Sequence, residues 1–359
     1  MKGLILAGGL GKRMRPLTHS GPKQLIPIAN KPVLHYCVED LANAGIKEIG
    51  VIVGYDEERI SAIKNALGDG SEWGVKITYI EQDAPRGLAH AVGIAEEFLG
   101  GEPFVVYLGD NLVKGGIAHF ISKFDKNKCT ASLLLAQHSM PHKFGVAVLE
   151  NGKLVDVEEK PENPKSNLVI AGVYIFTRCI FEAIKQITPG KHGELQLTDA
   201  IKILMQSPER SVSTEVVSGW WDDMGTSEDI LRANRMILLD IKSDIRGSVS
   251  KNVSVIGNVQ IGEGTVIEEN CVIKGPVVIG KNCRIGPDAY IGPYTSIGDN
   301  TTMRSGEIED SIIIGDCTLN FREKIVNSLI GRNSCITSNG NKLPKGHKFI
   351  LGEFSNIET

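Results

Sequence analysis

The sequence predicts two domains of different fold class. Residues 1–242 are expected to form a Rossmann-like α/β domain with a mixed, mostly parallel sheet, and residues 243–359 a parallel β-helix with a C-terminal tail. Three observations predict this division. Short apolar runs alternate with helix-like stretches in the first part, and aliphatic residues recur every six positions in the second. The chain of 359 residues is also longer than one ordinary core accommodates.

The first part of the chain alternates between two kinds of segment. Strands are expected where short apolar runs occur, at 3–7, 48–53, 76–80, 103–108, 130–137, 144–149 and 168–176. Helices are expected at 31–45, 56–68, 87–100 and 228–241. Strand and helix in turn are typical of a mostly parallel sheet that is covered by helices on both faces.

The second part has a six-residue period that continues from Val249 to Met303. A small residue follows four positions after most of these aliphatic residues, as Thr265 and Cys283 do. Repeats of this kind predict a parallel β-helix, with the aliphatic side chains inside the prism and the small ones near its tight corners. The phase then breaks, and 312–318 and 329–336 resume the pattern out of register. The regular hexapeptides resemble those of the left-handed β-helix family.

Composition excludes several classes of protein. The net charge is −4 with no basic block, which argues against a nucleic-acid partner. No apolar run reaches the length of a membrane span, so no membrane partner is expected. The seven cysteines include no CxxC pair. They therefore indicate reduced thiols in a cytoplasmic protein, in preference to a zinc site or a disulfide framework.

The loop after the first expected strand is rich in glycine and in positive charge. Its glycines stand at positions 8, 9 and 11, and the first acidic residue of the chain is Glu39. The cations before it are Lys2, Lys12, Arg13, Arg15, Lys23 and Lys31. Glycines after a strand let main-chain N–H groups approach a phosphate, and unopposed cations repel one another unless an anion is bound. The loop is therefore expected to bind phosphate; the alternative is a solvated charged turn.

Two common phosphate-binding motifs do not fit this loop. A Walker A motif fails because Gly11-Lys12 is followed by Arg13 and the earlier glycine has the wrong spacing. A dinucleotide fingerprint fails because Pro16, Pro22 and Pro27 keep the chain out of helix until about residue 31, and no acid follows at the required distance.

The loop, GGLGKRMRPLT followed by PKQLIPIANKP, resembles the signature of the sugar-1-phosphate nucleotidyltransferases. The likeness is closest to the long-form glucose-1-phosphate thymidylyltransferases of that family. It continues through GLAHA (87–91), YLGDN (107–111), FGVAVL (144–149), VEEKP (157–161), AGVYIF (171–176), GELQLTDA (193–200) and GWWDDMGT (219–226), and into the hexapeptide repeats.

The resemblance implies a reaction that makes dTDP-glucose and pyrophosphate from dTTP and glucose-1-phosphate. The sugar phosphate attacks the α-phosphorus in line. Its second pKa is near 6, so it is largely a dianion at pH 7 and needs no general base. The barrier lies in bringing two polyanions together, which calls for cations, main-chain donors and a metal ion. The resemblance implies that Asp110 and Asp223 hold Mg²⁺, and the match falls on Asp223 in preference to Asp222.

The resemblance also implies the residues that bind the nucleotide. Arg13 and Lys23 match the cations on the triphosphate and are, with Lys160 on the sugar phosphate, the expected catalytic residues. Gln82 and Gly87 match the positions that read the pyrimidine edge. The full expected nucleotide site is Leu6, Gly8, Gly9, Gly11, Lys12, Arg13, Gln24, Gln82, Gly87 and Asp110.

The expected sugar-phosphate site is Gly145, Glu159, Lys160, Val169, Tyr174 and Trp221. Two of these residues have a structural alternative. Tyr174 could instead be a core residue of its strand, and Trp221 could pack between sheet and helix. His90 and His192 are interpreted as structural.

Three rival functions remain at this point. A β-helix that transfers an acyl group would be expected to use a histidine as base, but residues 245–346 contain no histidine. The β-helix is therefore interpreted as an assembly or regulatory module of a homo-oligomer. A non-catalytic regulatory relative would be expected to lack a metal carboxylate or a loop cation, and all are present. UTP or an amino sugar as substrate stays open, since pyrimidine edges differ only by a methyl group.

Overall fold

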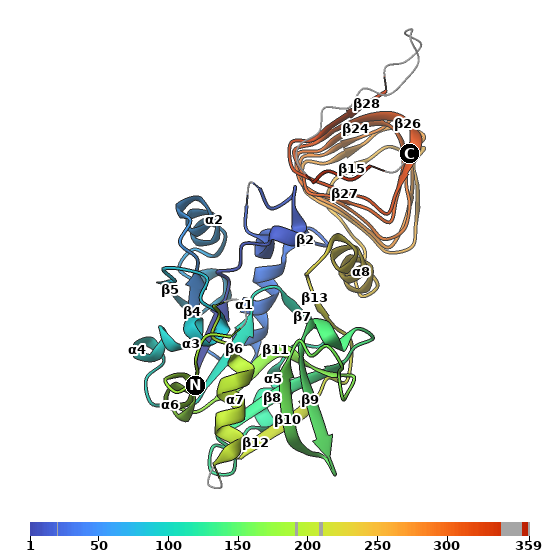
Figure 1. Ribbon diagram of the computed structural model, residues 1–359. Coiled ribbons are helices and arrows are strands. Elements are labelled where there is room, and N and C mark those ends of the chain that lie inside the picture. The colour runs from blue at the N-terminus through green and yellow to red at the C-terminus, as the bar shows by residue number, and fades with distance from the viewer. Residues whose placement is uncertain (20, 191–192, 208–210, 339–353, 358–359) are drawn as a thin grey trace. The chain divides into compact units, whose positions relative to one another are not determined.

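The computed structural model describes residues 1–19, 21–190, 193–207, 211–338 and 354–357, and Figure 1 shows the course of the chain. The chain divides into two compact units. The first unit comprises Met1–Leu10, Gly21–Leu25 and Val33–Asp223, and the second comprises Gly11–Ser20, Ile26–Pro32 and Met224–Thr359. The glycine-rich loop therefore contributes to both units. The domain boundary expected at 242/243 stays a prediction, because a compact unit need not coincide with a domain.

The helices of the first unit follow the expected apolar spacing. They are α1 (Val33–Asn43), α2 (Glu57–Leu67), α3 (Leu88–Gly93), α4 (Glu96–Leu99), α5 (Ala118–Lys123), α6 (Cys179–Ile184) and α7 (Leu197–Gln206), with 3₁₀ turns η2 (Lys23–Leu25), η3 (Ser71–Trp73) and η4 (Pro141–Lys143). Asp56 begins α2 by accepting a hydrogen bond from the N–H of Arg59 at 3.0 Å. The single helix expected at 87–100 is two short helices, α3 and α4, and α3 ends at Gly93.

The strands of the first unit are β1 (Lys2–Leu6), β4 (Glu48–Val53), β5 (Lys76–Glu81), β6 (Phe104–Leu108), β7 (Asn111–Val113), β8 (Ala131–Gln137), β9 (Gly145–Glu150), β10 (Lys153–Glu159), β11 (Leu168–Phe176), β12 (Val212–Val216) and β13 (Trp221–Asp223). Within the described residues, nine of them form one sheet in the order β10-β9-β11-β6-β1-β4-β5, with β8 beside β11 and β12 beside β8. The pairs β1–β4, β1–β6 and β4–β5 are parallel. The pairs of β11 are antiparallel, which confirms the mixed sheet.

The sheet has an apolar core on each face. Leu4 and Leu6 of β1 point into one core, where α3, α4, α6 and α7 contribute buried residues. Ile5 and Ala7 point into the other, with α1, α2 and α5. This alternation follows from the two-residue period of a strand. The parallel direction of β1 and β6 places the loops that follow both strands at one edge of the sheet, where open α/β sheets bind ligands.

The second unit is built on a parallel β-helix. It contains η1 (Lys12–Met14), the hairpin β2 (Pro27–Ile28) and β3 (Lys31–Pro32), and helix α8 (Ser227–Leu238). Its coil strands are β14 (Asp244–Ile245), β15 (Ser248–Val249), β16 (Ser254–Ile256), β17 (Val259–Ile261), β18 (Val266–Ile267), β19 (Val272–Lys274), β20 (Val277–Ile279), β21 (Arg284–Ile285), β22 (Ala289–Ile291), β23 (Thr295–Ile297), β24 (Thr302–Glu309), β25 (Ile312–Ile313), β26 (Thr318–Val326), β27 (Leu329–Ile330) and β28 (Cys335–Thr337). The coils are consistent with the expected left-handed β-helix.

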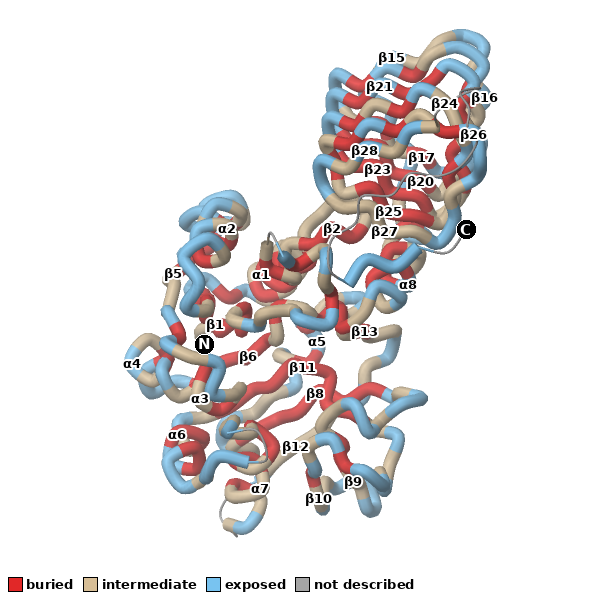
Figure 2. Tube along the Cα trace, turned by 45° about the horizontal axis from the view of Figure 1, so that its top comes forward, coloured by how far each residue is buried: buried red, intermediate tan, exposed pale blue. Residues whose placement is uncertain are grey.

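The inside of the β-helix carries the residues that the six-residue period predicts. The aliphatic residues from Ile261 to Met303 are buried in one core, and Figure 2 shows buried positions recurring along successive coils. Ile261 pairs with Ile279, and Ile279 with Ile297, each 18 residues on. The next partners, Ile313 and Ile330, lie only 16 and 17 residues on. These shorter coils explain why the sequence pattern loses its phase after Met303.

Candidate functional site

The two predicted metal ligands lie at the carboxyl end of a central strand. Asp110 follows β6 after a single glycine, and β7 then pairs antiparallel with β13, so that Asp223 stands opposite Asn111. A short two-stranded ladder therefore brings together positions 110 and 223, which are far apart in the sequence. Asp222 is buried, whereas Asp223 is partly exposed. The expectation that Asp223 is the ligand stays a prediction.

Lys23 forms an ion pair with Asp110 within the first unit. The side chains of Lys23 and Asp110 are only 13% and 16% exposed. Such a pair is poorly solvated and more strongly coupled than a surface pair. The Lys23 ammonium therefore lies directly against an expected metal ligand. The site thus contains both a cation and a carboxylate, as a site for phosphate and a metal ion requires.

A chain of hydrogen bonds supports Asp110 from the other side. Asn111 donates from Nδ2 to Oδ1 of Asp110 at 2.9 Å, and its own Oδ1 accepts from the indole Nε1 of Trp221 at 2.8 Å. Asn111 is 2% exposed. A Cβ on Gly172 would lie 2.9 Å from the Asn111 amide, so only glycine leaves room for it. The sequence alone predicts no role for Asn111 or Gly172, although they lie in the motifs YLGDN (107–111) and AGVYIF (171–176).

The predicted nucleotide residues of the first unit gather around the start of the glycine loop. A Cβ on Gly8 would lie 3.1 Å from Oε1 of Gln82, and one on Gly9 would lie 3.6 Å from Nε2 of Gln24. Leu6 and Gln24 are buried. The Oε1 atom of Gln24 is buried without a hydrogen-bond partner in the described residues. A buried amide oxygen of this kind is costly unless a bound donor satisfies it.

His90 orients Gln82. The Nε2 atom of Gln82 lies 3.0 Å from Nδ1 of His90. An amide nitrogen can only donate, so Nδ1 accepts and the imidazole carries its proton on Nε2. That Nε2 lies 3.8 Å from Asp83. His90 was interpreted as structural, and the signal that could have found it is its spacing of eight residues from Gln82 across a turn into a helix. His192 lies outside the described residues.

Gly87 begins helix α3 in a conformation that only glycine adopts easily. Its φ is 100°, and a Cβ there would lie 2.4 Å from the carbonyl oxygen of Leu195. Leu195 in turn donates its N–H to Arg86 and accepts from Ala89. The close approach of these two main-chain segments fixes the position at which α3 begins. It thereby also sets the direction in which His90 projects from the helix.

The predicted sugar residues surround the Glu159 carboxylate. Thr198 donates to Oε2 of Glu159 at 3.3 Å, Lys160 lies 3.4 Å from Oε1, and a Cβ on Gly145 would lie 3.3 Å from Oε2. Burial, and secondarily the charge of Glu159, raise the pKa of the Tyr174 hydroxyl well above its usual range, so it stays neutral. The structure thus brings Gly145, Glu159, Lys160 and Tyr174 together.

Three of the predicted sugar residues, Val169, Tyr174 and Trp221, have mainly apolar or aromatic neighbours. Val169 is fully buried in the core that contains α1, α2 and α5. Tyr174 is also buried, and its ring stacks on that of Phe176 with centroids 5.6 Å apart, so the structural alternative stays open for it. Trp221 packs edge-on against Phe144 with ring centroids 5.4 Å apart, while its N–H is directed to Asn111. Through Asn111, Trp221 is therefore connected by hydrogen bonds to Asp110.

Gly11, Lys12 and Arg13 belong to the second unit. Gly11 has φ 63° and its carbonyl accepts a hydrogen bond from Thr18 at 2.8 Å. Lys12 and Arg13 are exposed on the turn η1, and Met14 anchors that turn by burying its side chain. The two cations therefore point to solvent from a turn whose main chain is held in place.

The carboxylates fit a hard divalent ion. Among the described residues no cluster of three or more histidine, cysteine or acidic side chains could hold a metal by itself. Mg²⁺ usually keeps several waters and binds through one or two carboxylates together with substrate phosphates. Two aspartates at adjacent strand ends are a donor set of that kind.

A cleft of about 770 Å³ lies elsewhere in the first unit, beside β10, α7 and β12. Its lining includes Lys153, Asp156 and Lys202, and none of the predicted site residues. It is not the candidate site, because the paired charges and buried amides described above lie outside it.

Comparison with known proteins identifies relatives of this chain. The family model "Nucleotidyl transferase" matches residues 2–239, and the model "GMPPB C-terminal domain" matches residues 273–353. The chain is 46% identical to a low-salt glycan biosynthesis nucleotidyltransferase of Haloferax volcanii, with 100% of both chains covered. It is 44% identical to a glucose-1-phosphate thymidylyltransferase of Streptomyces antibioticus, with 100% of this chain and 99% of that protein covered.

A solved structure matches the first part of the chain. It is that of a Bacillus anthracis protein assigned as a glucose-1-phosphate thymidylyltransferase, in complex with a sucrose. The TM-score is 0.63 at 36% identity, and the match covers 68% of this chain and 97% of the other. Nucleotidyltransferases of this kind generally use a divalent metal ion. The expected fold class and enzyme class are thereby confirmed, and the chain belongs to the nucleotidyl transferase family.

Proposed function

We propose that this protein transfers a thymidylyl group from dTTP to glucose-1-phosphate, releasing pyrophosphate and forming dTDP-glucose, with Mg²⁺ as the metal ion. The observation that carries the proposal is the Lys23–Asp110 pair beside the β7–β13 ladder, at the carboxyl end of β6. It supplies both signs of charge at the place where α/β sheets bind ligands. The full-length likeness to a glucose-1-phosphate thymidylyltransferase supports the choice of substrates.

Each group has a role in this reaction. Lys23 neutralises negative charge on the triphosphate as the sugar phosphate attacks the α-phosphorus, with Arg13 as a second cation. Asp110 and Asp223 would hold Mg²⁺, which when bound offsets charge on the phosphates of both substrates. Because the attacking phosphate is already a dianion, no side chain has to remove a proton.

The remaining residues select the two substrates. Gln82, oriented by His90, would exchange hydrogen bonds with the pyrimidine edge, and the buried amide oxygen of Gln24 would accept a hydrogen bond from a bound donor. On the sugar side, the Glu159 carboxylate would accept hydrogen bonds from sugar hydroxyl groups, and the exposed Lys160 side chain would contact the sugar phosphate. Both of these sites are built from hydrogen-bonding groups, which discriminate more sharply than apolar surface.

A panel of substrates tests the proposal. Pyrophosphate release is followed with dTTP, UTP, ATP and GTP, each against glucose-1-phosphate, mannose-1-phosphate and N-acetylglucosamine-1-phosphate, with and without Mg²⁺. The proposal expects the highest kcat/KM for dTTP with glucose-1-phosphate and no release without a divalent ion. A higher kcat/KM with UTP or with the amino sugar would overturn the substrate assignment while leaving the reaction class in place.

Assembly and location complete the proposal. In the described residues, no helix has the length and apolar character needed to cross a membrane. We propose that the β-helix serves assembly or regulation in a homo-oligomer, since its sequence from residue 245 to 346 has no histidine to act as an acyl-transfer base. The cytoplasmic location stays a prediction.

A further inference from the structure

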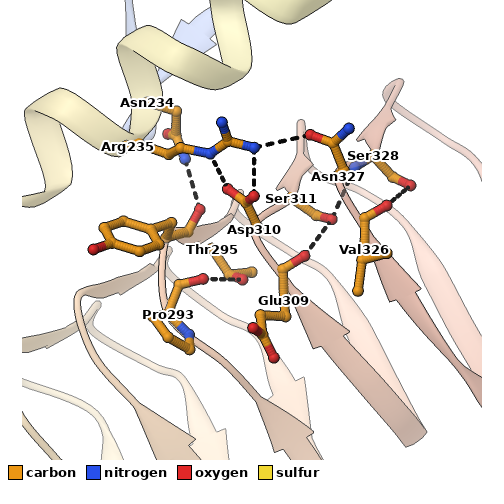
Figure 3. A network of polar contacts seen from close by, with 11 residues as sticks. Asn234, Arg235, Pro293, Thr295, Glu309, Asp310, Ser311, Val326, Asn327 and Ser328 are labelled. Atoms are coloured by element: carbon orange, nitrogen blue, oxygen red, sulfur yellow. Dashed lines mark hydrogen bonds and ion pairs between the residues drawn. The ribbon is translucent and has the colours of Figure 1, made fainter.

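Asn234 joins three segments of the second unit. It lies on α8 and is 1% exposed. Its Oδ1 accepts hydrogen bonds from the N–H of Ala29 at 2.9 Å and from the hydroxyl of Ser296 at 2.7 Å. Its Nδ2 donates to the carbonyl of Tyr294 at 3.0 Å, and Figure 3 shows the side chain reaching from α8 toward the β-helix coil. One buried carboxamide therefore connects the helix, a coil strand and the β2–β3 hairpin.

The hairpin needs this support because its turn is unfavourable. Pro27 pairs with Pro32 and Ile28 with Lys31, so Ala29 and Asn30 form a two-residue turn. Their φ angles are 48° and 63°. Glycine and asparagine tolerate such angles, but alanine does not adopt them readily. The hydrogen bond to the N–H of Ala29 offsets that cost, and Asn30 adds a second tie by donating to the carbonyl of Ile297 at 2.6 Å.

The hairpin is continuous in sequence with the segment that carries two expected nucleotide ligands. Gly21–Leu25, with Lys23 and Gln24, belongs to the first unit, and Ile26 follows it directly in the second. Consecutive Cα atoms are held about 3.8 Å apart. The preceding stretch, Gly11–Ser20, also belongs to the second unit, where Met14 is buried. The ligand-bearing segment is therefore joined directly, at Leu25–Ile26, to the hairpin segment of the second unit.

We propose that Asn234 is a positioning residue for the nucleotide loop. By fixing the β2–β3 hairpin on α8 and on β23, it limits the positions that Lys23 and Gln24 can take, although it touches no substrate itself. The β-helix thus contributes to nucleotide binding through the main chain of the loop. This inference rests on the proposed function only in taking Lys23 and Gln24 as nucleotide ligands.

Arg235 offers a matched control on the same helix. Its guanidinium forms an ion pair with Asp310, and it donates to Oδ1 of Asn327 at 2.9 Å. Figure 3 shows these contacts between α8 and the later coils. Arg235→Ala should loosen α8 on the β-helix as Asn234→Ala does, but it leaves the bond to Ala29 intact. The comparison separates a role in the hairpin from a general loss of stability.

Steady-state kinetics of the full-length enzyme test the proposal. Asn234→Ala is expected to raise KM for dTTP by roughly tenfold to a hundredfold, the range that an ångström-scale misplacement of a binding group costs. KM for glucose-1-phosphate should change much less. Arg235→Ala should lower the thermal midpoint but keep the wild-type KM for dTTP. An equal rise in KM for both variants, or an unchanged KM in a folded Asn234→Ala protein, would overturn the proposal.

Two further measurements keep the test decisive. Asn30→Ala removes the second tie at a half-buried position, and it should raise KM for dTTP in the same direction even if Asn234→Ala does not fold. Hydrogen exchange of the peptide that covers residues 26–32 should be faster in Asn234→Ala than in Arg235→Ala. Exchange reports on the hairpin without any turnover, so it separates failure of this inference from failure of the proposed function. Equal exchange rates in the two variants would refute the inference.

Discussion

Lys23 and Asp110 are 87 residues apart in the sequence and form an ion pair at the carboxyl end of β6, both largely buried. The pair joins the glycine-rich loop to an expected metal ligand. A nucleotide with its metal ion brings new partners to both groups, since phosphate attracts the lysine and the divalent ion attracts the aspartate. Under the proposed function, nucleotide binding would exchange the ionic partners of Lys23 and Asp110 and would leave neither charge buried alone.

Lys23→Met is expected to lower kcat/KM with dTTP on the order of a hundredfold to a thousandfold, the cost of removing one preorganised donor to the reacting phosphates. Initial-rate measurements with both substrates varied will give the value. Lys64→Met is the control, because Lys64 pairs with Glu81 at 3.1 Å on the surface and both side chains are substantially exposed. A surface pair of that kind contributes about 0–1 kcal/mol. Similar rates for the two variants would contradict the assignment of Lys23.

Asp223→Ala is expected to remove metal-dependent turnover while the protein stays folded. The loss should be on the order of a thousandfold, because a metal ion supplies several kcal/mol of charge stabilisation and each ~1.4 kcal/mol is tenfold in rate. Rates measured across a Mg²⁺ titration, with circular dichroism as the check on folding, will test this. A variant with the wild-type dependence on Mg²⁺ would exclude Asp223 as a ligand.

The sequence predicted the architecture because both folds leave periodic marks in it. The six-residue repeat placed Ile261 and Ile279 inside the β-helix, and their burial in its core confirms it. Supporting contacts leave no such mark. Trp221 and Asn111 lie 110 residues apart, and Asn234 and Ala29 lie 205 apart. The local sequence pattern does not connect the two members of either pair. They come into contact only when the strands and helices of the whole unit have packed together.

His90→Ala is expected to raise KM for dTTP by roughly fivefold, the change that corresponds to about 1 kcal/mol for one hydrogen bond. The cause is the loss of the bond that orients Gln82, so KM for glucose-1-phosphate should stay the same. His119→Ala serves as the control, because His119 is 73% exposed and lies near a glutamate, Glu215, at 3.6 Å. If His90→Ala altered both KM values equally, His90 would act on the fold and not on Gln82.

Gly172→Ala tests the space that Asn111 needs. Gly172 has φ 67°, and the added Cβ would lie 2.9 Å from the Asn111 amide. The expected destabilisation is about 2–4 kcal/mol, from the left-handed backbone and from overpacking together. Gly152→Ala isolates the first cause, because Gly152 has φ 75° and open space around it, and its cost should be about 1–2 kcal/mol. Thermal denaturation will compare them; equal midpoints would mean that Asn111 has room to move.

Two threonines at equivalent corners of the β-helix should respond oppositely to the same substitution. Thr265 and Thr301 are fully buried, and each precedes a strand in the same ladder, β18 and β24. The Thr265 hydroxyl donates to the carbonyl of Gly280 at 2.6 Å and accepts from the N–H of Cys283 at 2.9 Å. The Thr301 hydroxyl is buried without a hydrogen-bond partner in the described residues. Valine has the same shape as threonine but cannot form hydrogen bonds.

Thr265→Val should therefore destabilise the β-helix by about 1–3 kcal/mol, because it leaves the N–H of Cys283 unsatisfied. Thr301→Val should be neutral or stabilising by up to about 1–3 kcal/mol, since it removes a hydroxyl that is buried without compensation. Urea unfolding followed by a probe confined to the β-helix, such as a label on the exposed Cys335, will measure both. A loss of stability in Thr301→Val as large as that in Thr265→Val would show that the Thr301 hydroxyl has a partner, such as a buried water, and that the two corners are chemically alike.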